Sequence, residues 1–216
     1  KKKIYGKKIT TYGLSRKCNY SATNVKIIKK NNSYLTSFDL IENFGKKKIL
    51  KNFTSPLLGD HNVKNILASI SVSRGVKISY ANIKKALKKF SGVKRRFTVL
   101  HKSKDNLIID DYAHHPIEIK ETLKSLKEIT NNQIISIFEP HRYSRISAMI
   151  DDFVHCFKNS NQIFVLPVFS AGEKKINKID SAFFYKKLKE KYINKNIYLS
   201  EYNNFFFDRL KEKMIP

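Results

Sequence analysis

The stretch that decides the fold runs Leu107-Ile108-Ile109-Asp110-Asp111-Tyr112-Ala113-His114-His115-Pro116. Its opening apolar run, closed by polar residues, is typical of a short strand that is buried on both faces of a sheet. Proline suits the first position of a helix, where its missing N–H is no loss, so Pro116 predicts a helix over 116–130. Residues 111–115 therefore lie on a strand-to-helix turn. In open α/β sheets, such turns are where ligands bind.

The alternation of strand and helix continues after residue 130. Strands are expected at 133–138, 162–166 and 196–200, and each is followed by an expected helix, within about 145–158, at 180–192 and at 203–213. This alternation implies right-handed crossovers and a parallel sheet covered by helices on both faces. The fold class is therefore α/β, with a C-terminal Rossmann-like parallel sheet. The chain has no G-x-G-x-x-G motif, so a dinucleotide is not indicated.

The preceding part of the chain is predicted to be rich in β-strands and to end in two helices. The first helix opens at Gly59-Asp60-His61-Asn62, with Asp60 or Asn62 as its cap, and ends at Gly75. A basic segment, 92–97, then closes a helical pair and opens a strand. We therefore expect two domains, 1–91 and 92–216. The expected strands are 9–14, 25–28, 33–40 and 46–53, and the second helix spans about 79–90.

The formal net charge of +25 raises the question of nucleic acid, because Lys and Arg neutralise phosphates. Only seven of the 43 basic residues are Arg, and the lysines are spread over nearly every segment. A nucleic-acid surface more often concentrates Arg beside aromatic residues. A solvated, Lys-rich surface is therefore favoured, and no nucleic-acid partner is expected. A non-catalytic, basic nucleic-acid-binding module stays open as the alternative of another class.

The cellular setting follows from the cysteines and the hydropathy. Cys18 and Cys156 form neither a disulfide framework nor a metal-ligand spacing, which suits a reducing compartment. No apolar run approaches the ~20 residues that cross a bilayer. We expect a cytoplasmic protein without membrane insertion.

A second polar turn, Glu139-Pro140-His141-Arg142-Tyr143-Ser144-Arg145, follows the next expected strand and should lie at the same sheet edge as residues 111–115. Arg142 and Arg145 share a face if a helix begins between them. Two guanidinium groups there suit a carboxylate or a phosphate, which Arg holds through paired hydrogen bonds. The alternative is that one of these arginines pairs with Asp110 or Glu139.

Two other kinds of chemistry are considered at these turns. A metal site built on His114, His115 and His141 is not favoured, because adjacent histidine side chains diverge and no further ligand has a suitable spacing. Asp110 and Asp111 point to opposite faces of a strand, so one should meet a ligand while the other makes structural hydrogen bonds.

Four motifs occur in order along the chain: G-x-H-N-x-x-N at 59–65, G-V-K-R-R-F at 92–97, D-D-Y-A-H-H-P at 110–116 and P-H-R-Y-S-R at 140–145. In this combination the chain resembles the Mur ligases. Within that family it is most similar to the members that join L-alanine to UDP-N-acetylmuramate, which Ala171-Gly172-Glu173 also fits. The nearest alternatives are the murein peptide ligase and other Mur ligases.

The resemblance implies an ATP-dependent ligase of peptidoglycan synthesis. ATP would phosphorylate the substrate carboxylate to an acyl phosphate, which the alanine amine would attack. By resemblance, Asn62 and Asn65 lie near the adenine, although ordinary capping of the helix is the alternative. Arg96 would lie near the phosphates and Asp111 at the ribose hydroxyls. The residues implied on the amino-acid side are Tyr112, His114, His141, Arg142 and Arg145.

The departures from the family pattern are also informative. The family's G-T-x-G-K-T phosphate loop is absent, as are the UDP-binding domain, the Mg²⁺ ligands and a late glycine-rich segment. The resemblance therefore implies a partial copy, in which 1–91 is the second part of the central ATPase domain and 92–216 is most of the C-terminal domain. We expect this chain alone to be inactive, with the Mg²⁺ ligands outside it.

Overall fold

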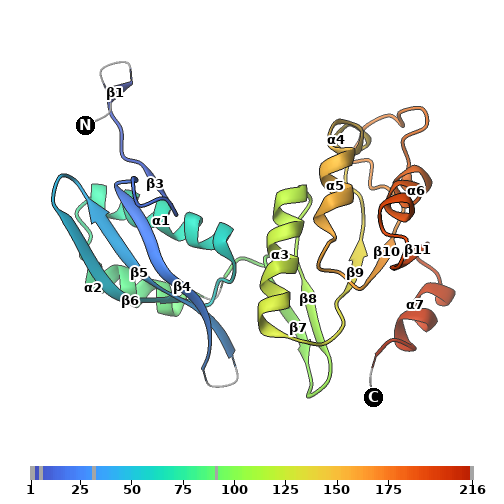
Figure 1. The fold of residues 1–216 in the computed structure, drawn as a ribbon, viewed down its shortest axis with the longest axis horizontal. Helices are drawn as coiled ribbons and strands as arrows, with labels where there is room; N and C mark the ends of the chain where they lie inside the picture. Colours follow the sequence, from blue (N-terminus) through green and yellow to red (C-terminus); the bar gives the residue numbers. More distant parts are fainter. Residues whose placement is uncertain (1–2, 5–6, 31–32, 91, 215–216) are drawn as a thin grey trace. The chain divides into compact units, whose positions relative to one another are not determined.

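The computed structural model describes residues 3–4, 7–30, 33–90 and 92–214. The chain divides into two compact units, Lys1–Lys94 and Arg95–Pro216 (Figure 1). The sequence placed this division three residues earlier, between residues 91 and 92. Separate clusters of buried apolar residues lie in each unit, so each has a hydrophobic core of its own.

An antiparallel sheet is the framework of the first unit (Figure 1). Strands β4 (Tyr20–Lys30), β5 (Ser33–Asn43) and β6 (Lys47–Ser55) pair in that order, and β3 (Tyr12–Gly13) joins β4 in parallel. The four strands expected from the sequence overlap these four. A short antiparallel pair, β1 (Lys3–Ile4) and β2 (Lys7–Lys8), was not expected.

Two helices complete the first unit: α1 (Asp60–Gly75) and α2 (Tyr80–Lys89). The apolar residues of α1 recur at helical spacing and pack against Phe38 and Phe53 of the sheet. These residues are Val63, Ile66, Leu67 and Ile70, all buried. The predicted cap of α1 is wrong. Gly59, with a positive φ of 90°, occupies the cap position, and no side chain accepts a hydrogen bond there.

The second unit contains the predicted parallel sheet. Strands β9 (Ile135–Phe138), β10 (Gln162–Val165) and β11 (Asn196–Leu199) are parallel, with β10 in the centre. Helices α3 (Pro116–Ile129), α5 (Ile150–Cys156) and α6 (Ser181–Lys191) contribute to the core that contains Ile163 and Val165. On the other face, Phe206 of α7 (Asn204–Lys211) packs against Phe164. Helices therefore cover both faces, as predicted.

The strand that opens the decisive stretch differs from its prediction. It spans Leu107–Asp110 as β8, and it pairs antiparallel with β7 (Thr98–Lys102) in a separate two-stranded sheet. Ile108 is 40% exposed, so the strand is not buried on both faces. The physical reason is the short turn between β7 and β8, where Ser103 and Asn106 hydrogen-bond to each other. A short connection joins antiparallel neighbours, whereas parallel neighbours need a long crossover.

The helix expected within 145–158 is interrupted. It begins at Tyr143 as α4 (Tyr143–Ala148), breaks at Met149 and resumes as α5. Met149 has φ −132° and ψ 29°, which lies outside the helical range. Within the described part of the chain, no helix combines the length and the apolar character that crossing a membrane requires.

Replacement of Phe184 by alanine tests the core of the second unit. Phe184 is fully buried on α6 and contacts the rings of Phe138, Phe153 and Phe157. We expect Phe184→Ala to lower the free energy of unfolding of this unit by about 3–5 kcal/mol, because it leaves a cavity among these rings. Urea denaturation followed by circular dichroism measures the change.

Phe205→Ala is the matched control, since Phe205 on α7 is 66% exposed and contacts the Arg209 guanidinium. It should cost about 1 kcal/mol or less, the value of an exposed cation–π contact. Equal losses in the two variants would contradict the assignment of the core.

Candidate functional site

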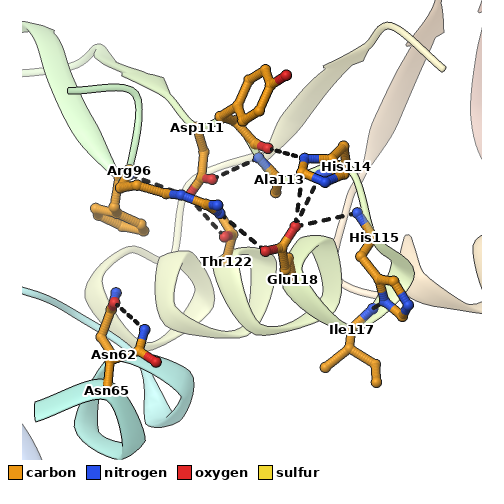
Figure 2. A network of polar contacts seen from close by, with 12 residues as sticks. Asn62, Asn65, Arg96, Asp111, Ala113, His114, His115, Ile117, Glu118 and Thr122 are labelled. Carbon is orange, nitrogen blue, oxygen red and sulfur yellow. Dashed lines mark hydrogen bonds and ion pairs between the residues drawn. The ribbon is translucent and has the colours of Figure 1, made fainter. Parts of the chain in front are cut away.

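The carboxylate of Asp111 lies just beyond the end of β8 and joins three segments of the second unit. One oxygen accepts the Ala113 N–H at 2.8 Å, and the other accepts the Phe97 N–H at 3.2 Å and the Thr122 hydroxyl at 3.0 Å (Figure 2). Burial raises the pKa of Asp111, although these hydrogen bonds oppose the shift. A carboxylate offers about four acceptor positions. Three are used here, so one remains for a ligand hydroxyl.

Asp110 points to another partner. Its carboxylate lies 3.4 Å from Nε of Arg95, whose guanidinium also lies 4.9 Å from the centre of the Tyr112 ring. Glu139 accepts a hydrogen bond from the Tyr202 hydroxyl. Arg95 and Tyr202 thus take the places that the alternative interpretation gave to Arg142 or Arg145.

Glu118 of α3 holds the turn in place. Its Oε2 accepts the backbone N–H groups of His114 and His115 at 3.2 and 3.3 Å, and its Oε1 lies 3.1 Å from Nη1 of Arg96 (Figure 2). Burial opposes the ionisation of Glu118, but the His114 amide and the Arg96 guanidinium outweigh it and lower the pKa of this carboxyl.

His115 completes this arrangement as the cap of α3. Its Nδ1 accepts the Ile117 N–H at 3.3 Å, and Pro116 is the first helical residue, as predicted. Glu118 was not among the residues predicted from the sequence. The signal was available, because a polar residue followed three positions later by Glu is the spacing of a capping box.

The second turn, between β9 and α4, is held by the loop that follows β10. Arg142 N–H donates to the Phe169 carbonyl at 2.9 Å, and Phe169 N–H donates to the Pro140 carbonyl at 2.8 Å. His141 and Phe169 thereby form an isolated parallel bridge. Arg142 has φ 71°, a backbone conformation that costs a residue with a side chain roughly 1–3 kcal/mol. The Phe169 bridge holds the turn in this strained form.

The rings of the two turns meet, although β8 and β9 belong to different sheets and the turns do not share one sheet edge as predicted. His114 lies 5.7 Å from His141 between ring centres, and the Tyr112 ring lies 5.0 Å from His114 and 6.4 Å from His141. The Phe169 ring, from the loop after β10, lies 5.4 Å from the His141 ring between ring centres. The residues between β8 and α3 and those between β9 and α4 therefore form one site.

The two arginines at this site, Arg142 and Arg145, differ in their contacts. Nη1 of Arg145 lies 3.3 Å from Nδ1 of His141 and 3.5 Å from the carbonyl oxygen of His114. The Arg142 side chain is exposed and makes no hydrogen bond or ion pair with residues 3–4, 7–30, 33–90 or 92–214. Burial, together with Arg145, His114 and Arg142, lowers the pKa of His141. An uncharged imidazole beside two guanidinium groups suits an anionic ligand.

Glu173 fastens the start of α4 from the loop after β10. Its two oxygens accept the Ser144 hydroxyl at 2.6 Å and the Ser144 N–H at 3.1 Å, and these bonds lower the pKa of Glu173. The turn before it uses positive φ values at Ala171 (49°) and Gly172 (84°). The contacts of Glu173 were not predicted from the sequence, because the loop from 167 to 178 carries no periodic signal that fixes its path.

Asn62 and Asn65 lie on α1 of the first unit. Asn62 is only 7% exposed, and its amide donates to the Leu58 carbonyl at 2.8 Å. Asn65 is exposed, and its amide lies 3.5 Å from Oδ1 of Asn62. The buried Asn62 therefore positions the side chain of Asn65, and Asn65 presents its carboxamide to solvent.

No metal centre is apparent among the described residues, either at the two turns or at Asn62 and Asn65. Among the residues that the structure describes, no three or more His, Cys, Asp or Glu side chains gather so as to hold a metal ion.

Comparison with known proteins gives a consistent set of similarities. A family model described as the glutamate ligase domain of Mur ligases matches residues 95–207. The chain is 40% identical over 177 residues to the UDP-N-acetylmuramate–L-alanine ligase of Agrobacterium fabrum, across 81% of this chain and 37% of that protein. It thus spans about two fifths of the length of the curated relatives that it matches.

Solved structures show the same similarity. The UDP-N-acetylmuramate–alanine ligase of Thermotoga maritima aligns with a TM-score of 0.69 and 26% identity, over 96% of this chain and 42% of that one. A murein peptide ligase from Psychrobacter arcticus aligns with a TM-score of 0.56 and 19% identity, over 93% and 40%. The second alignment shows a common fold only.

Replacement of Glu173 by alanine tests the fastening of α4. We expect Glu173→Ala to speed hydrogen exchange at the Ser144 amide, because this N–H loses its charged acceptor. In the unaltered chain the lowered pKa of Glu173 means that the bond is present above the ordinary glutamate pKa of about 4.3. Protection should be lost only as the pH falls through the lowered value.

Glu190→Ala is the matched control. Glu190 is an exposed glutamate of α6 whose partner is Lys187. Glu190→Ala should leave hydrogen exchange at the Ser144 amide unchanged. Equal exchange at Ser144 in the Glu173 variant and the unaltered chain would contradict the role of Glu173.

Proposed function

The chain belongs to the Mur ligase family, and we propose that it takes part in the ATP-dependent joining of L-alanine to UDP-N-acetylmuramate in peptidoglycan precursor synthesis. The observation that carries this proposal is the unpaired guanidinium of Arg142 beside Arg145 and the uncharged His141. The relative from Agrobacterium fabrum, which bears the name of that activity, supports the choice of substrates.

The amino-acid side of the reaction is proposed at the two turns of the second unit. Arg142 and Arg145 hold the carboxylate of L-alanine, each through charge-assisted hydrogen bonds worth about 1.5–3 kcal/mol. Tyr112, His114 and His141 form the aromatic wall beside it. A planar guanidinium suits this task better than an ammonium would, because its paired N–H groups match a carboxylate.

The nucleotide side uses residues that also have structural partners. Arg96 keeps N–H groups free of Glu118 for a phosphate, and Asp111 keeps one acceptor position for a ribose hydroxyl. We propose that Asn65, positioned by Asn62, contacts the adenine. ATP supplies the phosphoryl group that converts the carboxylate of UDP-N-acetylmuramate to an acyl phosphate, which the alanine amine attacks.

The domain assignment is part of the same proposal. Residues 1–91 correspond to the second part of the central ATPase domain of a Mur ligase, and 92–216 correspond to most of its C-terminal domain. We propose that the Mg²⁺ that accompanies ATP is held by ligands outside this chain. Cys18 and Cys156, both free thiols, fit the proposed cytoplasmic location.

Phosphate release tests the proposed function directly. The full-length protein that contains this chain, given ATP, Mg²⁺ and UDP-N-acetylmuramate, should release phosphate when L-alanine is added. The 216-residue chain alone should not, because it has no G-T-x-G-K-T loop. Release with a tripeptide but not with L-alanine would instead favour a murein peptide ligase. A DNA affinity that falls steeply with salt, without ligase activity, would favour the basic binding module.

Replacement of Arg142 by alanine tests the carboxylate contact. In the full-length protein we expect Arg142→Ala to raise the KM for L-alanine by about 10- to 150-fold, the equivalent of the ~1.5–3 kcal/mol of a charge-assisted hydrogen bond. The KM for ATP should stay unchanged. Steady-state kinetics with each substrate varied in turn measures both.

Arg209→Ala is the matched control. Arg209 is an arginine of α7 whose guanidinium contacts the Tyr198 and Phe205 rings. Arg209→Ala should alter neither the KM for L-alanine nor the KM for ATP. An unchanged requirement for L-alanine in the Arg142 variant would refute the role given to this residue.

A further inference from the structure

The two histidines of the site hold their ring nitrogens in opposite ways, and the first of them is His114. Its Nδ1 lies 2.8 Å from the carbonyl oxygen of Tyr112. A carbonyl can only accept, so the proton of this hydrogen bond lies on Nδ1 of His114. In the uncharged ring, Nε2 then carries a lone pair. That nitrogen is available to accept a proton.

His141 is in the reverse state. Its Nδ1 lies 3.3 Å from Nη1 of Arg145, and a guanidinium can only donate. Nδ1 of His141 therefore accepts, and the ring proton lies on Nε2. The lowered pKa of His141, caused by burial and by the charges of Arg145, His114 and Arg142, agrees with a ring that stays uncharged. Its remaining nitrogen is a donor and cannot take up a proton.

We propose that Nε2 of His114 is the base that takes a proton from the α-ammonium group of the incoming amino acid, and that His141 remains a hydrogen-bond donor. The inference rests on the proposed function, since it needs an amine as the nucleophile. The assignment follows from the partners, because Tyr112 and Arg145 fix the two tautomers independently of any ligand.

The proposed proton transfer and the C–N bond formation that follows it conserve protons and electrons. One N–H bond of the ammonium breaks, its electron pair stays on nitrogen, and a new N–H bond forms at Nε2 of His114, which becomes an imidazolium. The amine lone pair then forms the C–N bond with the acyl phosphate carbon. The C–O bond to phosphate breaks with its electron pair on the leaving oxygen, and the second proton lost by nitrogen passes to the departing phosphate.

The surroundings of His114 suit this step. Glu118 Oε2 lies 3.9 Å from Nδ1 and meets the positive charge that the ring acquires. The Tyr112 and His141 rings lie 5.0 and 5.7 Å from the His114 ring between centres, and the Arg145 guanidinium lies 3.5 Å from the His114 carbonyl oxygen. A base oriented through its second nitrogen by a fixed acceptor is the general pattern of activated proton transfer in enzymes.

The first test measures the tautomers in the 216-residue chain itself. Long-range ¹H–¹⁵N correlation spectra of histidine-labelled protein distinguish a proton on Nδ1 from a proton on Nε2. We expect Nδ1–H at His114 and Nε2–H at His141, with signals assigned from His114→Gln and His141→Gln variants. Arg145→Ala should release His141 from its single tautomer and leave His114 unchanged. Nε2–H at His114, or Nδ1–H at His141, would overturn the proposal.

The second test uses the pH dependence of the full-length protein. We expect His114→Gln to lower kcat by about 10²- to 10⁴-fold at neutral pH, the usual contribution of a general base. The deficit should shrink as the pH rises, because more amino acid then arrives as free amine. Hydroxylamine, which is already unprotonated at neutral pH, should react almost equally with both proteins. A deficit that is independent of pH and of the amine would mean that His114 is only structural.

His115→Asn is the matched control, because His115 is the neighbouring imidazole and only caps α3. Asparagine retains a capping oxygen, so activity and its pH profile should be unchanged. The outcomes separate the two proposals. Absence of ligase activity with the expected tautomers would refute the function alone. Activity with reversed tautomers would refute the role of His114 alone.

Discussion

The carboxylate of Glu118 is the constraint on which the site depends. It accepts the backbone N–H groups of His114 and His115 and pairs with Arg96, so one side chain fixes both the entry to α3 and a candidate phosphate ligand. Because these partners keep the carboxyl ionised despite its partial burial, the turn is held by charge-assisted bonds. Asp111 accepts the Ala113 N–H within the same turn and joins the turn to Phe97 and to Thr122 of α3. The histidine rings are thus presented from a fixed backbone.

The second turn obtains its rigidity from a different source. Its backbone at Arg142 has a positive φ, and the Phe169 bridge holds this strained form. At this turn the Arg142 side chain is exposed, while the Arg145 guanidinium lies against His141. Two arginines three positions apart therefore play different parts. One contacts the imidazole and the other is open to a ligand. Arg145, which is held by His141 and the His114 carbonyl, is a preorganised donor that can bind charge without having to reorganise.

Several parts of the fold follow from local patterns in the sequence. The alternation of strands and helices after residue 130 predicted the parallel sheet, and Pro116 correctly marked the start of α3. The pairing of β8 was predicted wrongly, since its apolar run resembles that of a central strand. Whether such a run joins a parallel sheet or a local hairpin is decided by its neighbours. Here the turn at 103–106 brings β7 to β8.

The sequence by itself determined which residue types stand at the two turns, and motif order was enough to indicate the family. It did not determine what each side chain does there. That Asp111 bonds Phe97 and Thr122, that Glu118 pairs with Arg96 and that Glu173 fastens Ser144 depends on contacts between residues 11 to 29 positions apart in the chain. The tautomers of His114 and His141 depend on the folded geometry of their own turns. The physical reason is that hydrogen-bond donors and acceptors are paired in space, and only tertiary packing decides which of them meet.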